Sequence, residues 1–264
     1  MNRITNYEEL KTRIVEWLKD YVSDNPTIKS FVVGVSGGID SAVVSTLCAE
    51  TGLPTYVLSM PLHSNSQNDS LSNDYTDYLK KKYSNVTKIR IDLTSTYDQL
   101  LKSFDFWTGE KSFTSNNLAN ANTKSRIRMV TLYQVAGSVS GIVVGTGNKV
   151  EDYGVGFYTK YGDGGVDIAP IADLYKTEVW ELGKHLGVDQ RIIDAPPTDG
   201  LWEDNRTDED QIGTSYEFLE WVMEKGLFED PLFLNEKESK AIQQYQKFNT
   251  QNKHKMLSIP TFKL

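Results

Sequence analysis

The stretch Phe31–Ser41 reads F-V-V-G-V-S-G-G-I-D-S and decides the fold. Its first five residues are apolar and mostly β-branched, with one glycine among them, which is typical of a buried strand in a parallel sheet. The next glycines require a sharp turn, and the apolar run over 42–49 predicts a helix. A strand, a Gly-rich turn and a helix N-terminus form an anion site in this order, because backbone N–H groups and the helix dipole both favour negative charge.

This turn is neither of two common nucleotide-binding loops. No lysine follows the glycines, so G-x-x-x-x-G-K-[ST] is absent, and G-x-G-x-x-G is absent as well. The pattern S-G-G-x-D-S resembles the pyrophosphate-binding loop of the N-type ATP pyrophosphatases, which cleave ATP between the α and β phosphates. The resemblance implies that Ser36, Gly38 and Ser41 hold the pyrophosphate and that Asp40 helps hold Mg²⁺. The alternative is a plain βα turn with Asp or Ser as helix caps.

Length and composition fit one globular α/β domain over residues 1–264. Hydrophobic residues make up 39% of the chain and charged residues 24%. No apolar run approaches the roughly 20 residues that cross a bilayer, and the N-terminus lacks the apolar core of a signal peptide. The single cysteine, Cys48, excludes an internal disulfide and a Cys-rich metal site. We therefore expect a cytoplasmic protein with no membrane partner.

The charge balance bears on the class of ligand. The net charge is −8 and the pI is about 5.0, whereas proteins that track long nucleic acids need a basic surface, so nucleic acid is not an expected partner. An acidic protein that binds a nucleotide should concentrate its cations at the site. Arg126 and Arg128 fit this expectation, because they stand near the start of a predicted helix, where cations oppose the dipole and a bound anion would explain them.

Hydrophobic periodicity and turn signals place the other elements. Further strands are expected at 54–60, 86–92 and 141–145, with a short fifth strand at 166–170. Helices are expected at 5–22, 67–84, 94–104, 118–138, 176–187, 209–225 and 236–249. Loops are expected at 105–117, 152–165 and 194–206, and the five glycines of 152–165 indicate a mobile segment.

Strands that alternate with helices predict a doubly wound parallel sheet with helices on both faces, an α/β fold. Ligands of such sheets bind at the carboxyl ends of the strands, near the switch point in strand order. Ser36–Ser41, His63 and Thr146–Glu151 all follow predicted strands, so we expect them at one edge of the sheet. For His63 alone, a solvated loop histidine is the simpler explanation.

Several motifs together resemble the ammonia-dependent NAD synthetases over about residues 30–260. They are G-V-S-G-G-I-D-S at 34–41, N-T-K-S-R-I-R-M at 122–129, G-T-G-N-K-V-E at 145–151, G-F-Y-T-K-Y-G-D-G-G-V-D-I-A-P at 156–170, L-Y-K-T-E-V at 174–179, P-P-T-D at 196–199 and H-K at 254–255. The segment F-Y-T-K-Y-G-D-G-G is nearly diagnostic by itself. The resemblance implies the adenine-nucleotide-hydrolase-like, Rossmann-like three-layer fold.

The resemblance implies an ATP-dependent amidation. ATP adenylates the carboxylate of deamido-NAD (nicotinic acid adenine dinucleotide) and releases pyrophosphate, and ammonia then attacks the acyl-adenylate to give NAD and AMP. Mg²⁺ and protein cations are expected around the triphosphate, because negative charge builds up on the leaving pyrophosphate. A dry pocket is expected as well, since water would hydrolyse the adenylate.

The same resemblance assigns site residues. The ATP-binding positions are Gly34, Val35, Ser36, Gly37, Gly38, Ile39, Asp40, Ser41, Thr146, Lys176 and Thr198. The deamido-NAD-binding positions are Asn122, Arg126, Lys160, Asp167, His254 and Lys255. The metal ligands are Asp40 and Glu151, and the catalytic positions are Lys176 and Asp163, with Asp163 taking a proton from ammonium. Two stretches, 152–156 and 196–204, depart from the usual family pattern.

Nitrogen donor and assembly follow from the same comparison. The synthetase pattern begins within about 30 residues of the first residue, which leaves no room for a glutaminase domain, so free ammonia is the expected donor. The family also implies a homodimer with deamido-NAD at the subunit interface.

Three alternatives stay open at this stage. Another AMP-forming amide ligase could share the phosphate loop, although Y-G-D-G-G argues against it. A tRNA-modifying pyrophosphatase is disfavoured by the low pI. A nucleotide-binding sensor without catalysis would need the loop, but not Glu151 or the 160–167 segment.

Overall fold

The computed structural model describes residues 4–63, 66–104, 113–198, 200–202 and 206–263. Within these residues one parallel sheet contains β1 (Ser30–Gly34), β2 (Thr55–Ser59), β3 (Val86–Arg90) and β4 (Gly141–Val143), in the order β3-β2-β1-β4. Val144 pairs with Ile168 in an isolated parallel bridge, which is all that forms of the predicted fifth strand. Strand order reverses beside β1, so the switch point lies next to the turn that follows β1.

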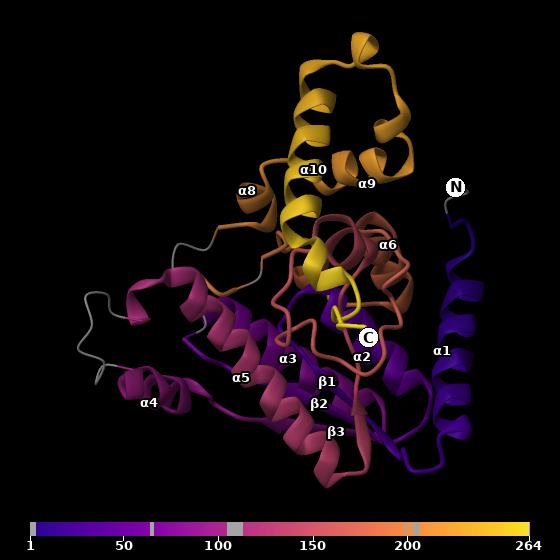
Figure 1. The fold of residues 1–264 in the computed structure, drawn as a ribbon. Coiled ribbons are helices and arrows are strands. Elements are labelled where there is room, and N and C mark those ends of the chain that lie inside the picture. The colour runs from indigo at the N-terminus through magenta and orange to yellow at the C-terminus, as the bar shows by residue number, and fades with distance from the viewer. Residues whose placement is uncertain (1–3, 64–65, 105–112, 199, 203–205, 264) are drawn as a thin grey trace.

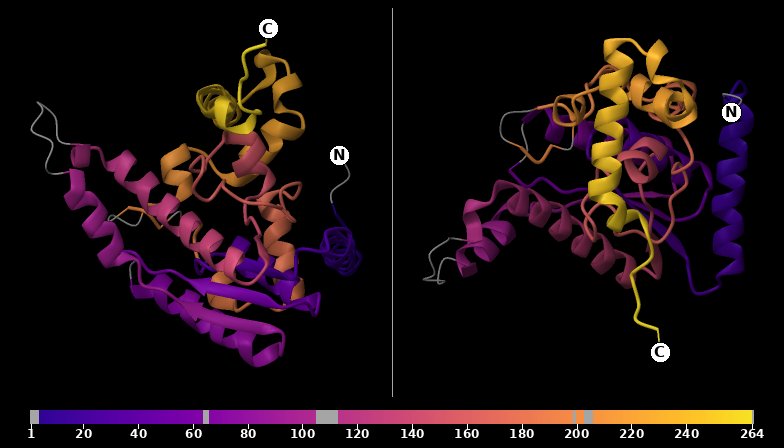
Figure 2. Two further views of the ribbon diagram at one scale, coloured as in Figure 1. Left: turned by 60° about the horizontal axis from the view of Figure 1, so that its bottom comes forward. Right: turned by 45° about the horizontal axis from the view of Figure 1, so that its top comes forward.

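Alternation along β1 directs its side chains into two layers. Phe31 and Val33 pack with α1 (Tyr7–Asp24), α2 (Ile39–Glu50), α3 (Ser66–Lys82) and α6 (Lys176–Leu186). Val32 faces the opposite layer, which contains α4 (Thr94–Phe104) and α5 (Asn117–Ser138). Helices therefore cover both faces of the sheet (Figures 1 and 2), as the doubly wound prediction requires.

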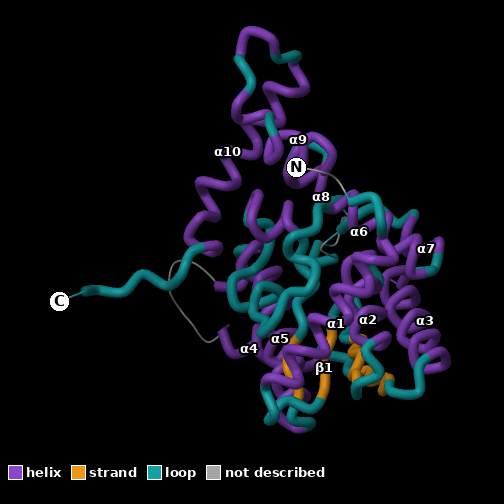
Figure 3. The backbone as a smooth tube through the Cα atoms, turned by 90° about the vertical axis from the view of Figure 1, so that its right-hand side faces the viewer, coloured by secondary structure: helices purple, strands orange, loops and turns teal. Residues whose placement is uncertain are grey.

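The C-terminal third packs on this core near the start of α6. It contains α7 (Gln190–Ile193), α8 (Asp208–Ile212), α9 (Tyr216–Glu224) and α10 (Glu236–Met256), and α9 and α10 stand above the sheet in Figure 1. A third apolar cluster joins them to the segment after β4; it contains Val150, Val155, Tyr175, Ile212, Tyr216 and Leu219. After α10 the last residues extend away from the body (Figure 3). No helix among the described residues is long and apolar enough to cross a membrane.

The structure also differs from the sequence-based expectation outside the sheet. The predicted loop 152–165 begins inside a π-helical turn, η2 (Val150–Val155). The single helix predicted at 209–225 is two, because Gly213 takes a left-handed φ of 87° and ends α8. Helix α10 runs to Met256, beyond the predicted residue 249. Residues 105–112, 199 and 203–205, in two of the predicted loops, lie outside the described chain.

Candidate active site at the carboxyl end of the sheet

The turn after β1 is held open by its own serines. Gly37 has a φ of 93°, a left-handed conformation that glycine adopts without strain. Ser36 Oγ accepts from the Gly38 N–H at 3.2 Å, and Ser41 Oγ accepts from the Ser36 N–H at 3.1 Å. In the described chain no side chain caps α2, so the N–H groups of its first turn are left for an anion.

A buried charge cluster lies next to this turn. Lys176 Nζ is 2.5 Å from Asp40 Oδ2 and 3.0 Å from Glu151 Oε1, and Lys176 is only 2% exposed. Burial lowers the pKa of Lys176, but the charges of the two carboxylates more than offset it and raise the pKa above its ordinary value. Burial also raises the pKa of Asp40, against the attraction of Lys176. Three elements thus bring one cation and two carboxylates together.

Asn148 ties the Asp40 carboxylate to the backbone of the turn that carries Glu151. Its Nδ2 donates to Asp40 Oδ1 at 3.3 Å, and its Oδ1 accepts from the N–H groups of Val150 and Glu151 at 3.0 and 3.2 Å. The side chain is fully buried, so these bonds also satisfy its polar atoms. Asn148 stands in the G-T-G-N-K motif, and an asparagine before a helical turn is the sequence signal that indicates such a role.

The donor set at this point has the chemistry that Mg²⁺ requires. The described residues contain no group of three or more His, Cys, Asp or Glu side chains that could hold a metal ion alone. Two carboxylates nevertheless converge on one cation, the Lys176 ammonium. Mg²⁺ in nucleotide enzymes is commonly held by one or two carboxylates together with phosphate oxygens and water. Asp40 and Glu151 therefore fit a metal that arrives with a nucleotide.

A second cluster surrounds Asp163. Asp163 Oδ1 accepts from Ser125 Oγ at 2.7 Å and from the Thr159 N–H at 3.0 Å, and Thr159 Oγ1 donates to Asn122 Oδ1 at 2.6 Å. Surrounding protein atoms raise the pKa of Asp163, and these hydrogen bonds act in the opposite direction. The residue is nevertheless exposed to solvent. Gly162 is required here, since a β-carbon at this position would collide with Ser125 Oγ.

One side of α10 holds the glycine-rich segment in place. Asn249 and Asn252 donate to the carbonyls of Gly154 and Val155, at 2.8 and 2.9 Å. Lys255 Nζ donates to the carbonyls of Gly156 and Tyr158, at 2.8 and 2.7 Å. Burial lowers the pKa of Lys255. The first part of the 152–165 segment, which was predicted to be mobile, is therefore fixed to α10. The hydrogen-bond donors come from that helix and not from the segment itself.

The other predicted site residues occupy different positions. Lys160 Nζ donates to the His254 carbonyl at 2.9 Å, and Arg126 Nε donates to the Lys160 carbonyl at 3.3 Å, so these three residues meet at the end of α10. Both carboxylate oxygens of Asp167 are engaged, with Tyr133 and with the Val143 N–H. Thr146 is half-buried and lies shortly after β4, in the stretch that leads to Glu151. Thr198 bonds within its own loop, to the Arg206 carbonyl.

Comparison with known proteins identifies the family. The sequence model described as NAD synthase matches residues 10–261. The chain belongs to the NAD synthase family. The NH(3)-dependent NAD(+) synthetase of Carboxydothermus hydrogenoformans is 38% identical over 223 residues, which cover 84% of this chain and 87% of that protein. The curated relatives cover most of both chains.

Solved structures of similar sequence share the fold. NMN synthetase from Francisella tularensis has a TM-score of 0.85 at 32% identity and covers 99% of this chain and 100% of that one. NH3-dependent NAD synthetase from Campylobacter jejuni has a TM-score of 0.74 at 26% identity, with 98% and 100% covered. The predicted fold class is confirmed, and membership in the NAD synthase family disfavours the rival ligases.

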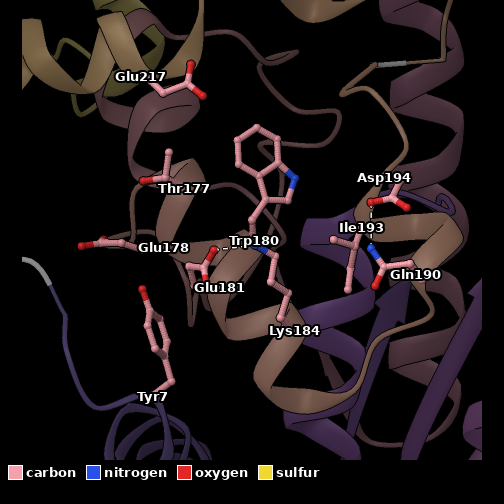
Figure 4. A pocket seen from close by; sticks show the side chains of 10 residues that line it. All are labelled: Tyr7, Thr177, Glu178, Trp180, Glu181, Lys184, Gln190, Ile193, Asp194 and Glu217. Atoms are coloured by element: carbon pink, nitrogen blue, oxygen red, sulfur yellow. Dashed lines mark hydrogen bonds and ion pairs between the residues drawn. The ribbon is translucent and has the colours of Figure 1, made fainter.

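A separate cavity of about 660 Å³ lies between α1, α6, α7 and α9, with Trp180 at its centre (Figure 4). Four of its polar side chains form two pairs with one another: Glu181 with Lys184, and Gln190 with Asp194. None of the predicted site residues lines it. The candidate active site of this NAD synthase family member at the sheet edge is therefore separate from this cavity.

Lys255→Met is expected to loosen the glycine-rich segment. The variant keeps the length of the side chain but leaves two carbonyls without their charged donor, a loss of about 1–3 kcal/mol in unfolding free energy. Urea denaturation should show this loss, and trypsin should cut faster at Lys160. The control is Lys253→Met on the exposed side of α10, where no change is expected. Equal stability of the two variants would contradict the assignment.

Proposed function

We propose that this chain catalyses the ATP-dependent amidation of deamido-NAD by ammonia, with AMP and pyrophosphate as co-products, as one synthetase domain over residues 1–264. The observation that carries the proposal is the meeting of the uncapped α2 N-terminus with Asp40, Glu151 and Lys176 at one sheet edge. In a member of the NAD synthase family, this arrangement supplies an anion site beside a cation site.

The first step forms the acyl-adenylate. A nicotinate carboxylate oxygen attacks the α-phosphorus of ATP, and the bond to the bridging oxygen of the β-phosphate breaks, so that pyrophosphate leaves with the electron pair. The Ser36–Ser41 turn is proposed to hold that pyrophosphate through backbone N–H groups, and Lys176 to balance its growing charge. Mg²⁺, held by Asp40 and Glu151, supplies further charge neutralisation at the phosphates when it is bound.

The second step forms the amide. The ammonia nitrogen attacks the acyl carbon, the bond to the adenylate oxygen breaks, and AMP leaves. Between ammonium and the amide the nitrogen loses two protons. Asp163 is the proposed acceptor of the first, which leaves ammonium and makes the nitrogen a nucleophile, and the second is lost after the attack. The Oδ1 of Asp163 is fixed by Ser125 and Thr159, which leaves Oδ2 free of a described partner and able to accept a proton.

The remaining substrate contacts complete the proposal. Asn122, Arg126, Lys160, Asp167, His254 and Lys255 are proposed to face deamido-NAD, and Thr146 and Thr198 to face ATP. We also propose a cytoplasmic homodimer whose interface includes the exposed side of α5, where Val130 is 61% and Leu118 59% exposed. Light scattering at micromolar concentration tests the assembly, and a fully active monomer would refute it.

A second candidate substrate comes from the relative named NMN synthetase, which this chain matches along its whole length. The corresponding reaction amidates nicotinic acid mononucleotide at the same carboxylate. The two substrates differ only in the adenylate half, so the steps above apply to both. The choice between them depends on whether the site binds that half.

Purified protein with ATP, Mg²⁺ and ammonium should form NAD from deamido-NAD, and deamido-NAD should outcompete the mononucleotide in a mixture. Glutamine alone should not support turnover, because the chain's single cysteine, Cys48, is completely buried and unsuited as an amidase nucleophile. Product analysis by chromatography distinguishes the cases. Preferred amidation of the mononucleotide would favour the second candidate, and NAD formation from glutamine alone would refute the nitrogen assignment.

A further inference from the structure

Tyr216 places a hydroxyl inside the charge cluster. It is the first residue of α9, is completely buried, and packs in the third apolar cluster with its ring edge-on to Trp180 at 6.1 Å. Its Oη lies 2.7 Å from Glu151 Oε1 and 3.2 Å from Asp208 Oδ2. Packing and the polar contacts together hold the ring in a single position.

The hydroxyl of Tyr216 contacts the carboxylate of Glu151. Its Oε1 lies within hydrogen-bond distance of both Tyr216 Oη, at 2.7 Å, and Lys176 Nζ, at 3.0 Å. Its Oε2 has no hydrogen-bond partner in the described part of the chain. Two donors on one oxygen fix the orientation of the carboxylate and leave the other oxygen available to a ligand.

Tyr216 also connects Glu151 to the 196–207 segment. Asp208 begins α8 directly after this segment, and its N–H donates to the Pro197 carbonyl at 3.0 Å, which closes the base of the loop. The Tyr216 N–H donates to Glu209 Oε1 at 3.1 Å, on the same short helix. The hydroxyl has one proton to donate, and the shorter distance favours Glu151 as its acceptor, with Asp208 as a second acceptor nearby.

We propose that Tyr216 is a positioning residue that holds Glu151 Oε1, so that Oε2 is presented to the divalent cation bound with ATP. The inference rests on the proposed function, because it assumes that Glu151 contributes to that cation site. It differs from a packing role of the ring, since the hydroxyl alone makes the contact with Glu151. Partners of this kind typically change metal affinity by about 10–100-fold when they are lost.

Tyr216→Phe tests the hydroxyl while keeping the ring and its packing. Electron paramagnetic resonance with Mn²⁺ as the probe should show weaker Mn²⁺ binding to the ATP complex by about 10-fold or more. ATP binding in the presence of a chelator should stay the same. The control is Tyr245→Phe, on α10 in the same apolar cluster but without a contact to the charge cluster, where Mn²⁺ affinity should not change.

The outcomes separate the inference from the proposed function. If the wild-type protein binds no Mn²⁺ with ATP, both are overturned. If the wild type binds and Tyr216→Phe binds equally well, the positioning role is wrong and the proposed function stands. Tyr216→4-aminophenylalanine provides a second variant should Tyr216→Phe fold poorly, because the amino group keeps a hydrogen-bond donor at the same place on the same ring. Its Mn²⁺ affinity should stay near the wild-type value, and a loss of about 10-fold or more would contradict the role.

Discussion

Lys176→Met is expected to lower the free energy of unfolding by about 3–5 kcal/mol, because loss of one member of a buried ion cluster leaves the others uncompensated. The Lys176 side chain is 3% exposed, and those of Asp40 and Glu151 are 17% and 16% exposed. Water therefore screens the two remaining carboxylates poorly. Urea denaturation without divalent cations measures the effect.

Divalent cations should reverse part of this loss. With the ammonium gone, Asp40 and Glu151 keep two negative charges that a divalent cation can neutralise, so Mg²⁺ should raise the stability of Lys176→Met more than that of the wild type. The control is Lys184→Met on the same helix, whose ion pair with Glu181 is half-exposed and contributes less than about 1 kcal/mol. Equal responses to Mg²⁺ in wild type and Lys176→Met would show that the carboxylates do not form a cation site.

Asp40→Asn and Glu151→Gln are expected to reduce exchange of labelled pyrophosphate into ATP by about 10²-fold or more, with deamido-NAD present. Each variant removes a charge that the proposed mechanism needs at the phosphates. Each also leaves Lys176 one carboxylate partner, so the fold should persist, and circular dichroism checks this.

The matched control for these variants is Asp173→Asn. Asp173 pairs with Lys149, but its side chain is 95% exposed, so the exchange rate should stay at the wild-type value. If either Asp40→Asn or Glu151→Gln exchanged pyrophosphate at the wild-type rate, the metal assignment would be wrong. Loss of exchange in Asp173→Asn would point to a general effect of charge.

Local pattern predicted the sheet well and the segments around it less well. Three strands are short apolar runs between turn signals, and β3 alternates apolar and polar residues. The structure confirms all four within two residues of their predicted ends. The π-helical turn at Val150–Val155 was not predicted, because glycines indicate a loop when only neighbours in sequence are considered. Its partners, Asn249 and Asn252, come from a helix about a hundred residues later.

In the candidate site, too, contacts between residues far apart in the sequence were not predicted from local pattern. Asp40, Glu151 and Lys176 were predicted by resemblance, and the structure brings them together. Tyr216 was missed because it falls in a predicted amphipathic helix, where a tyrosine looks like core. Its partner Glu151 lies 65 positions away. Asp208 was missed because an acidic run at a loop end usually faces water. A buried tyrosine hydroxyl nearly always has a partner, but sequence alone does not say which.

Transfer of oxygen from substrate to AMP tests the central claim most directly. Deamido-NAD labelled with ¹⁸O in its nicotinate carboxylate is incubated with the purified protein, ATP, Mg²⁺ and ammonium, and the products are analysed by mass spectrometry. An acyl-adenylate forms through a carboxylate oxygen, so one ¹⁸O atom should appear in AMP for each NAD formed, and pyrophosphate should carry none. Unlabelled AMP, or ¹⁸O in inorganic phosphate with ADP as co-product, would contradict the mechanism.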